Sequence, residues 1–229
     1  IYESIKNEDN SVTIELQLNG TTAGNSHPAH IHYNTAVEGG GIALTLGAVD
    51  GATGFSTVTV TTLNDSTPIT YEALLNFDGY INVHNSSIDL GTLIAQADIG
   101  QNVLTGNTRS YTLVAVDVPD INGSITFAER ANGEALAIIQ LANTPANGLH
   151  PAHIHAGSVA SAPGAILFTF NEVDGDTGIS LTNVSTLDDD TPFGYSDVVN
   201  VDGYVNVHLS ALDLATLVAQ GDIGINGSI

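Results

Sequence analysis

Apolar and polar residues alternate along several short segments of this chain. Residues 12–18 (Val-Thr-Ile-Glu-Leu-Gln-Leu) and residues 56–63 follow a period of two, which is the pattern of strands with one buried face. Residues 42–46 and 80–84 are further candidate strands, and Asn-Gly and Asp-Gly turn signals separate these segments. Short strands at regular spacing predict an all-β fold, namely an antiparallel Greek-key β-sandwich.

The chain also repeats itself. His-Pro-Ala-His-Ile-His stands at residues 27–32 and again at residues 150–155. Asp-Gly-Tyr-Ile-Asn-Val-His, at residues 78–84, returns with Val in place of Ile at residues 202–208. These blocks predict two tandem domains, residues 1–118 and 119–229, each long enough to fold alone.

One segment of the repeat follows the helical period instead of the strand period. Leu90, Leu93 and Ile94 would lie on one face of a helix over residues 86–96, with a Ser or Asp as its cap. We therefore expect one short helix in each β-sandwich domain.

The two repeats differ at their ends. Residues 110–115 (Ser-Tyr-Thr-Leu-Val-Ala) form a further candidate strand after the first repeat, and the second repeat reaches Ile229 before any counterpart. A sandwich that lacks an edge strand can accept an extended segment. We expect either a truncated second domain or a last strand that another chain donates.

Acidic residues dominate the charge of the chain. Asp and Glu number 25 and Lys and Arg number 3, so the net charge is -22 at pH 7. This charge repels nucleic-acid phosphates and anionic lipid, and no apolar stretch reaches the roughly 18 residues that span a bilayer. We expect neither a nucleic-acid partner nor membrane insertion. The absence of Cys excludes disulfides, thiolate metal sites and Cys nucleophiles.

All eight histidines fall within the repeated blocks, four per repeat at matching places. His30 and His32 are two residues apart and would share one face of a strand, and His84 could reach them from a neighbouring strand. Three imidazoles with an open position suit copper or zinc, and calcium and magnesium prefer oxygen ligands. We expect one such ion per domain, with copper preferred. The ligands of the second domain would be His153, His155 and His208.

Two further residues of each repeat have less certain places. His27 has the opposite parity from His30, so it could be a fourth ligand if the backbone bends, or it could brace the loop. Asn82 shares the parity of His84. It could orient a ligand histidine without itself contacting the metal ion. His150 and Asn206 take these places in the second repeat. The alternative for all of these histidines is a packed, hydrogen-bonded role in shaping a bend.

The repeated blocks resemble the chordin-type (CHRD) domain family. The resemblance rests on residues 27–32, 78–84 and 94–100 and their second copies, and it covers nearly the whole chain twice. It implies an exported or surface-attached protein. A more distant similarity links His27, His30 and His32 to the copper strand of copper/zinc superoxide dismutase. That similarity implies that His30 and His32 are copper ligands and that His27 is a supporting residue.

Three functions follow as expectations. The first is an extracellular, non-enzymatic binding and structural protein with one histidine-built copper or zinc site per domain. The second is a subunit of a surface layer or filament that assembles by strand donation, as a homo-oligomer. The third is a dismutase-like copper enzyme. The chain has no Gly-x-Ser-x-Gly elbow and no phosphate-binding loop that would support other catalytic chemistry.

Overall fold

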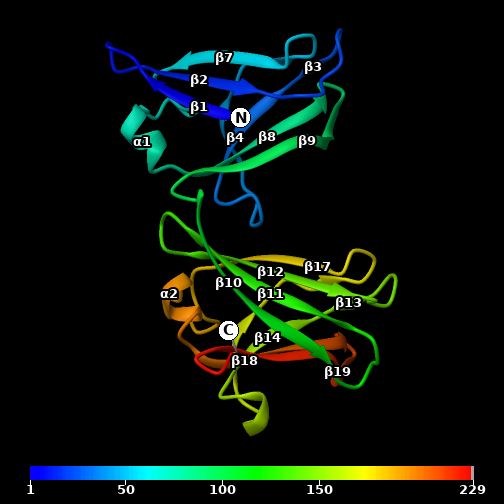
Figure 1. Ribbon diagram of the computed structural model, residues 1–229. Coiled ribbons are helices and arrows are strands. Elements are labelled where there is room, and N and C mark those ends of the chain that lie inside the picture. Colours follow the sequence, from blue (N-terminus) through cyan, green and yellow to red (C-terminus); the bar gives the residue numbers. More distant parts are fainter. Residues whose placement is uncertain (228–229) are drawn as a thin grey trace. The chain divides into compact units, whose positions relative to one another are not determined.

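A computed structural model describes residues 1–227, and most of these residues lie in antiparallel β-sheets (Figure 1). This confirms the prediction of an all-β, sandwich-like fold. The chain divides into two compact units, Ile1–Val103 and Leu104–Ile229, which we call unit 1 and unit 2. Among the described residues, no helix is long and apolar enough to cross a membrane.

In unit 1, two antiparallel sheets face each other across an apolar core. The first has the order β1-β2-β7 and consists of β1 (Tyr2–Lys6), β2 (Val12–Gln17) and β7 (Phe55–Val60). The second has the order β5-β4-β8-β9 and consists of β4 (Ala29–Tyr33), β5 (Ile42–Thr45), β8 (Asp78–Ser86) and β9 (Asp89–Gly100). A short pair is formed by β3 (Ser26–His27) and β6 (Val49–Asp50).

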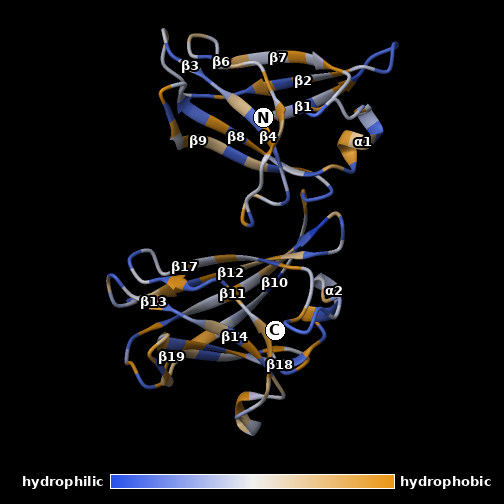
Figure 2. Cartoon of the chain, turned by 180° about the vertical axis from the view of Figure 1, so that it is seen from behind, coloured by the Kyte–Doolittle hydropathy of each residue, from blue (hydrophilic) through white to orange (hydrophobic). Residues whose placement is uncertain are grey.

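Alternation along the strands builds this core, as the sequence predicts. Val12, Ile14 and Leu16 of β2 are buried, and the residues between them are only partly covered. Ile31 of β4 and Ile81 of β8 join them from the second sheet. Each such buried aliphatic side chain stabilises the fold by roughly 1.5–3 kcal/mol. Figure 2 shows the same alternation of hydrophobic and hydrophilic residues along the strands of both units.

Unit 2 contains nine strands that follow the order of β1 to β9, preceded by one more strand, β10 (Leu104–Ala115). The nine are β11 (Asn122–Arg130), β12 (Ala135–Ala142), β13 (Leu149–His150), β14 (Ala152–Ala156), β15 (Ile166–Thr169), β16 (Val173–Asp174), β17 (Ile179–Val184), β18 (Asp202–Ser210) and β19 (Asp213–Gly224). A 3-10 turn, Val159–Ser161, lies between β14 and β15. Because β10 pairs with both β11 and β19, the strands of unit 2 join into one ten-stranded sheet.

The position of β10 differs from the sequence-based expectation. Residues 110–115 were expected to end the first domain, but Tyr111 pairs with Ile125 on β11, and Val114 pairs with Gln220 on β19. The division between the units therefore falls at residue 103 and not at residue 118. The second repeat was expected to lack a strand. That strand is β10, which lies at the beginning of unit 2.

The helix expected over residues 86–96 is a strand. β9 begins at Asp89 and forms a hairpin with β8, in which Ser86 pairs with Asp89. Leu90, Leu93 and Ile94 are exposed, so their helical spacing does not mark a buried stripe.

The helices of the two units lie elsewhere. They are α1 (Tyr71–Leu75) and α2 (Tyr195–Val198). Thr70 caps α1, because its side chain accepts a hydrogen bond from the backbone N–H of Ala73, and Leu74 packs into the core.

Candidate metal centres

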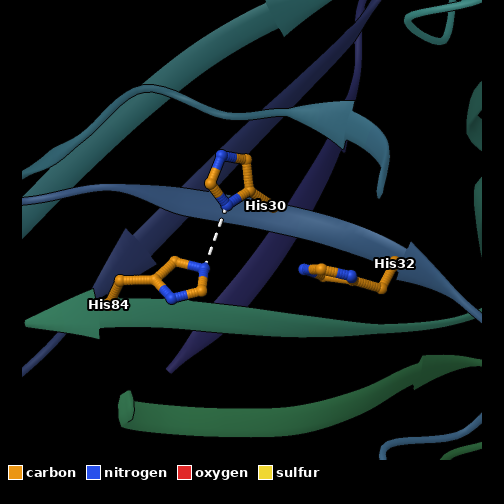
Figure 3. A group of neighbouring side chains, drawn as sticks. All are labelled: His30, His32 and His84. Atoms are coloured by element: carbon orange, nitrogen blue, oxygen red, sulfur yellow. Dashed lines mark hydrogen bonds between the residues drawn. The ribbon is translucent and has the colours of Figure 1, made fainter. Parts of the chain in front are cut away.

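Three histidines of unit 1 meet on the outer face of the β4–β8 strand pair. Ile31 and Ile81 face the core, and the period of two turns His30, His32 and His84 to the other face (Figure 3). One ring nitrogen from each histidine lies within 4.8 Å of the other two. His30 Nδ1 and His84 Nε2 are 3.1 Å apart and share a hydrogen bond (Figure 3). The structure therefore brings together the three residues that the sequence proposes as ligands.

Unit 2 repeats this arrangement on β14 and β18. Ring nitrogens of His153, His155 and His208 again lie within 4.8 Å of one another. The ring centroids of His153 and His208 are 5.0 Å apart, and those of His153 and His155 are 5.8 Å apart. The two triads have nearly the same shape, since the corresponding centroids in unit 1 are 5.0 and 6.0 Å apart.

Backbone carbonyl groups fix the tautomer of two histidines in each triad. His32 Nδ1 donates to the Gly40 carbonyl oxygen at 2.9 Å, and His84 Nδ1 donates to that of Leu90 at 2.7 Å. A carbonyl oxygen only accepts, so in the neutral imidazole the Nε2 atom carries the lone pair. In unit 2 the same bonds join His155 to Gly164 at 2.9 Å and His208 to Leu214 at 2.7 Å.

The nitrogens that face the centre of the second triad have no hydrogen-bond partner. His153 Nδ1, His155 Nε2 and His208 Nε2 are all buried and unpaired among the described residues. His32 Nε2 is in the same state in unit 1. Buried polar atoms almost always have a partner. A bound cation would satisfy three convergent ring nitrogens of this kind.

The electrostatics of the triads favour neutral imidazoles. Burial lowers the pKa of His30 and of His153, and the neighbouring imidazoles of each triad lower it further. Burial also lowers the pKa of His208. In all three residues the charged imidazolium is disfavoured, because it would lose hydration and lie near other imidazoles that could be charged. Neutral imidazole is the form that binds a metal ion.

A tyrosine that the sequence analysis did not single out supports each triad. In unit 2, Tyr204 stacks on His155, with ring centroids 5.2 Å apart. Its hydroxyl accepts a hydrogen bond from the Gly164 N–H at 2.8 Å. Tyr80 holds the same place in unit 1. The signal was present, because both tyrosines belong to the repeated Asp-Gly-Tyr block.

His27 and His150 lie outside the triads. His27 Nδ1 donates to the Asn85 carbonyl oxygen at 2.8 Å, and His150 Nδ1 donates to the Leu209 carbonyl oxygen at 2.8 Å. Each ring thereby ties the short strand before the His-x-His segment to the strand that carries the third histidine. This placement matches the bracing alternative and not the fourth-ligand alternative.

The two asparagines face the neighbouring strand. Asn82 Oδ1 accepts a hydrogen bond from Gln96 Nε2 at 2.8 Å, and Asn206 Oδ1 accepts one from Gln220 Nε2 at 2.7 Å. Both asparagines are buried beside the triads, since Asn82 pairs with His30 and Asn206 pairs with His153 across the sheet.

One charged residue distinguishes the two triads. Asp188 accepts hydrogen bonds from the backbone N–H and the hydroxyl of Thr169, which pairs with His153 across the sheet. Its negative charge raises the pKa of His153, against the larger effect of burial. In unit 1 the neutral Asn64 takes this place: its Oδ1 accepts a hydrogen bond from the backbone N–H of Thr45, and its Nδ2 donates to the Thr45 hydroxyl. A carboxylate therefore lies near the second triad where the first has an amide.

Comparisons with known proteins give no relative. No family model, no curated protein and no solved structure matches the chain. The resemblances to the chordin-type family and to copper/zinc superoxide dismutase therefore gain no support from these comparisons. What the fold and the sites define is an all-β protein with two histidine triads, each of which could hold a metal ion.

Proposed function

We propose that this protein binds one transition-metal ion in each unit, with copper preferred over zinc. It holds or sequesters the ion and does not turn over a substrate. The extracellular setting implied by the chordin-type resemblance is part of the same proposal.

The convergence of three buried, unpaired ring nitrogens in unit 2 carries this proposal. His155 and His208 each use Nδ1 on a backbone carbonyl oxygen, so the nitrogens left over are the ones that meet. The bracing residues His27 and His150 also leave a buried Nε2 atom unpaired, but neither belongs to a cluster in which such nitrogens converge. A polar atom that is buried without a partner costs about 1–3 kcal/mol, and three such nitrogens meet at one point here.

The chemistry of the donors favours copper or zinc. Three neutral nitrogen donors suit ions that prefer imidazole, and the absence of carboxylate donors in the triads disfavours calcium and magnesium. At a given nitrogen site copper(II) binds more tightly than zinc. The net charge of -22 would also raise the local concentration of any cation.

Elemental analysis tests the proposal. The full chain is loaded with copper or zinc, dialysed and analysed, and we expect about two equivalents of ion, with copper displacing zinc. His30→Ala and His153→Ala should each retain one equivalent, so each variant is the control for the other. The double variant should retain none. Less than about one equivalent in the loaded wild-type chain, or undiminished content in a folded double variant, would contradict the proposal.

A further inference from the structure

Arg109, on β10, is a basic residue whose charge is not neutralised within the part of the chain that the structure describes. Its guanidinium makes no hydrogen bond and no ion pair with any described residue. The chain has 25 acidic residues and only 3 basic ones, so most arginines in such a protein would be expected to have a carboxylate beside them. The surroundings of Arg109 therefore need a separate explanation.

The side chain of Arg109 lies on the inner face of β10. Tyr111 and Leu113 are two and four residues further along this strand, and both are buried in the core. The period of two places Arg109 on the same face, at the end of the row, where it is partly buried. Its guanidinium carbon lies 5.6 Å from the centroid of the Tyr111 ring. A guanidinium in this position loses hydration, and the aromatic ring offers no oxygen atom to replace the lost water.

A pocket of about 350 Å³ lies beside this guanidinium. We call it the arginine pocket, and it is lined by Thr108, Arg109, Tyr195, Val199 and Asn200, which belong to β10, to α2 or to the residues just after α2. The hydroxyl groups of Thr108 and Tyr195 make no hydrogen bond with a described residue, so both can donate. Asn200 Nδ2 donates to the Ser196 carbonyl oxygen at 2.8 Å, which uses one of its two hydrogens. The pocket thus combines one positive charge with several hydrogen-bond donors.

Tyr195 is protonated at neutral pH, which makes it a donor. Burial raises the pKa of its hydroxyl, the negative charge of Glu129 raises it further, and the positive charge of Arg109 lowers it by less. Glu129 is already occupied, because its Oε2 accepts hydrogen bonds from the Thr105 hydroxyl at 2.8 Å and from Asn107 Nδ2 at 2.7 Å. Glu129 therefore adds a negative charge near the pocket but does not form an ion pair with Arg109.

The helix of unit 1 neutralises a basic residue, and the helix of unit 2 does not. Glu72 on α1 forms an ion pair with Lys6. Ser196 takes the place of Glu72 on α2. The next residue, Asp197, accepts a hydrogen bond from the Gly194 N–H at 2.9 Å. The guanidinium beside α2 is thus without the carboxylate that the same place of unit 1 supplies.

We propose that the arginine pocket binds a small molecule that carries a single carboxylate group. The planar guanidinium of Arg109 donates to both carboxylate oxygens, because its parallel N–H groups match the spacing of these oxygens. The Tyr195 hydroxyl donates to the same group, and Val199 contacts the carbon chain of the ligand. The proposal is independent of metal binding.

The charge of the protein favours a carboxylate over a phosphate. The net charge of -22 repels every anion, and a doubly charged phosphate meets about twice the repulsion of a singly charged carboxylate. Arg109 provides one positive charge, which balances one negative charge. A pocket of this volume also has room for carbon atoms beside Val199, and an inorganic anion would not use that room.

NMR titration of the full chain without metal tests the proposal. The arginines of the chain are Arg109 and Arg130, so the side-chain Nε–H spectrum holds two signals, which Arg109→Lys assigns. The probe is sodium propionate, with sodium chloride at equal ionic strength as the reference. We expect a saturable shift of the Arg109 signal and no shift of the Arg130 signal. Propionamide has the same shape without the charge and should shift neither.

Variants locate the binding, which is then followed by the backbone amide signals of residues 195–200. Arg109→Gln should abolish it. Tyr195→Phe should weaken it by about tenfold, because a hydrogen bond to a charged group is lost. Glu129→Gln should strengthen it by about two- to fivefold, because a nearby negative charge is removed. Glu172→Gln removes the same charge from an exposed residue between β15 and β16, and it is the matched control that should have no such effect.

Three outcomes would overturn the proposal. The first is the lack of a saturable shift of the Arg109 signal in the wild-type chain. The second is undiminished binding of propionate to Arg109→Gln, with thermal unfolding to show that the variant is folded. The third is tighter binding of phosphate or sulfate than of propionate, since the pocket would then not select a single carboxylate. None of these results bears on the ion content of the triads, so the two proposals fail separately.

Discussion

Tyr80 lies flat against the imidazole of His32, with ring centroids 5.0 Å apart and an angle of 17° between the ring planes. The two side chains also share a backbone partner. The Tyr80 hydroxyl accepts the Gly40 N–H at 3.2 Å, and the Gly40 carbonyl oxygen accepts the Nδ1–H of His32 at 2.9 Å. Stacking sets the plane of the imidazole, and the hydrogen bond sets its tautomer. Together they aim His32 Nε2 at the centre of the triad.

Tyr80→Phe keeps the stacked ring but removes the hydroxyl that holds Gly40. We expect the affinity of unit 1 for copper to fall by about three- to tenfold, because outer hydrogen bonds of this kind orient a ligand. Titration of the His153→Ala background isolates unit 1. Tyr33→Phe, an exposed change next to His32 on β4, is the control and should leave the affinity unchanged. Equal losses in both variants would contradict the role of Gly40.

His27→Ala separates bracing from ligation. Loss of the bond to the Asn85 carbonyl oxygen, and of the buried ring itself, should lower the free energy of unfolding by about 1–3 kcal/mol. The loaded chain should still retain two equivalents of ion. Denaturant unfolding and elemental analysis measure the two effects, and His150→Ala should behave in the same way. A folded His27→Ala chain with one equivalent would show that His27 is a ligand.

The substitutions Asn64→Asp and Asp188→Asn should reverse the order of metal affinity of the two triads. Asp188→Asn should weaken binding at unit 2 by about two- to fivefold, because an exposed carboxylate gives a modest, screened attraction. Asn64→Asp should strengthen binding at unit 1 to a similar degree. Calorimetric titrations in the His30→Ala and His153→Ala backgrounds resolve the sites. Asp189→Asn is the matched control, and an equal effect there would point to general surface charge.

Acidification should release the ions and destabilise the ion-free chain. The pKa values of His30, His153 and His208 are lowered in the folded state, and an unfolded His titrates near about 6.5. Below that pH the unfolded chain binds more protons than the folded chain, so stability falls. Above it, the contribution is fully present. The ion-free chain should therefore lose stability between about pH 7.5 and pH 5.

Thermal unfolding across this range measures the effect. The variant His30→Ala/His153→Ala/His208→Ala should show a flatter dependence on pH, because the groups with lowered pKa are gone. The lower limit of pH 5 avoids the carboxyl groups, such as Asp50 and Asp174, whose pKa is also lowered and which protonate only in stronger acid. Full ion content at about pH 4 would argue against imidazole ligands.

Parity along a strand was sufficient to predict the members of each triad. His30 and His32 share a face because side chains alternate with a period of two, and His84 arrives on a paired strand. The places of Gly40 and Leu90 could not be predicted in this way. Each depends on a loop or hairpin that folds back over the outer face of the sheet, and the sequence pattern does not encode that path.

The errors of sequence reasoning have one physical source. Residues 86–96 and residues 110–115 were assigned from local pattern, but their structure depends on distant partners. β9 takes its form from pairing with β8, and its apolar residues at helical spacing are exposed, so the spacing does not mark a buried face. Similarly, β10 pairs forward along the chain with β11 and β19, and the alternation of its side chains does not reveal which strands it joins.

The difference between Asn64 and Asp188 also bears on how a chain with two such sites would behave. Two identical sites would fill together over a narrow span of free ion concentration. Two sites of modestly unequal affinity fill over overlapping ranges, with the tighter site ahead, so one polypeptide would buffer the free ion over a somewhat wider span. As the free ion concentration falls, the ion at the weaker site would dissociate first, and the ion at the tighter site would stay bound longer.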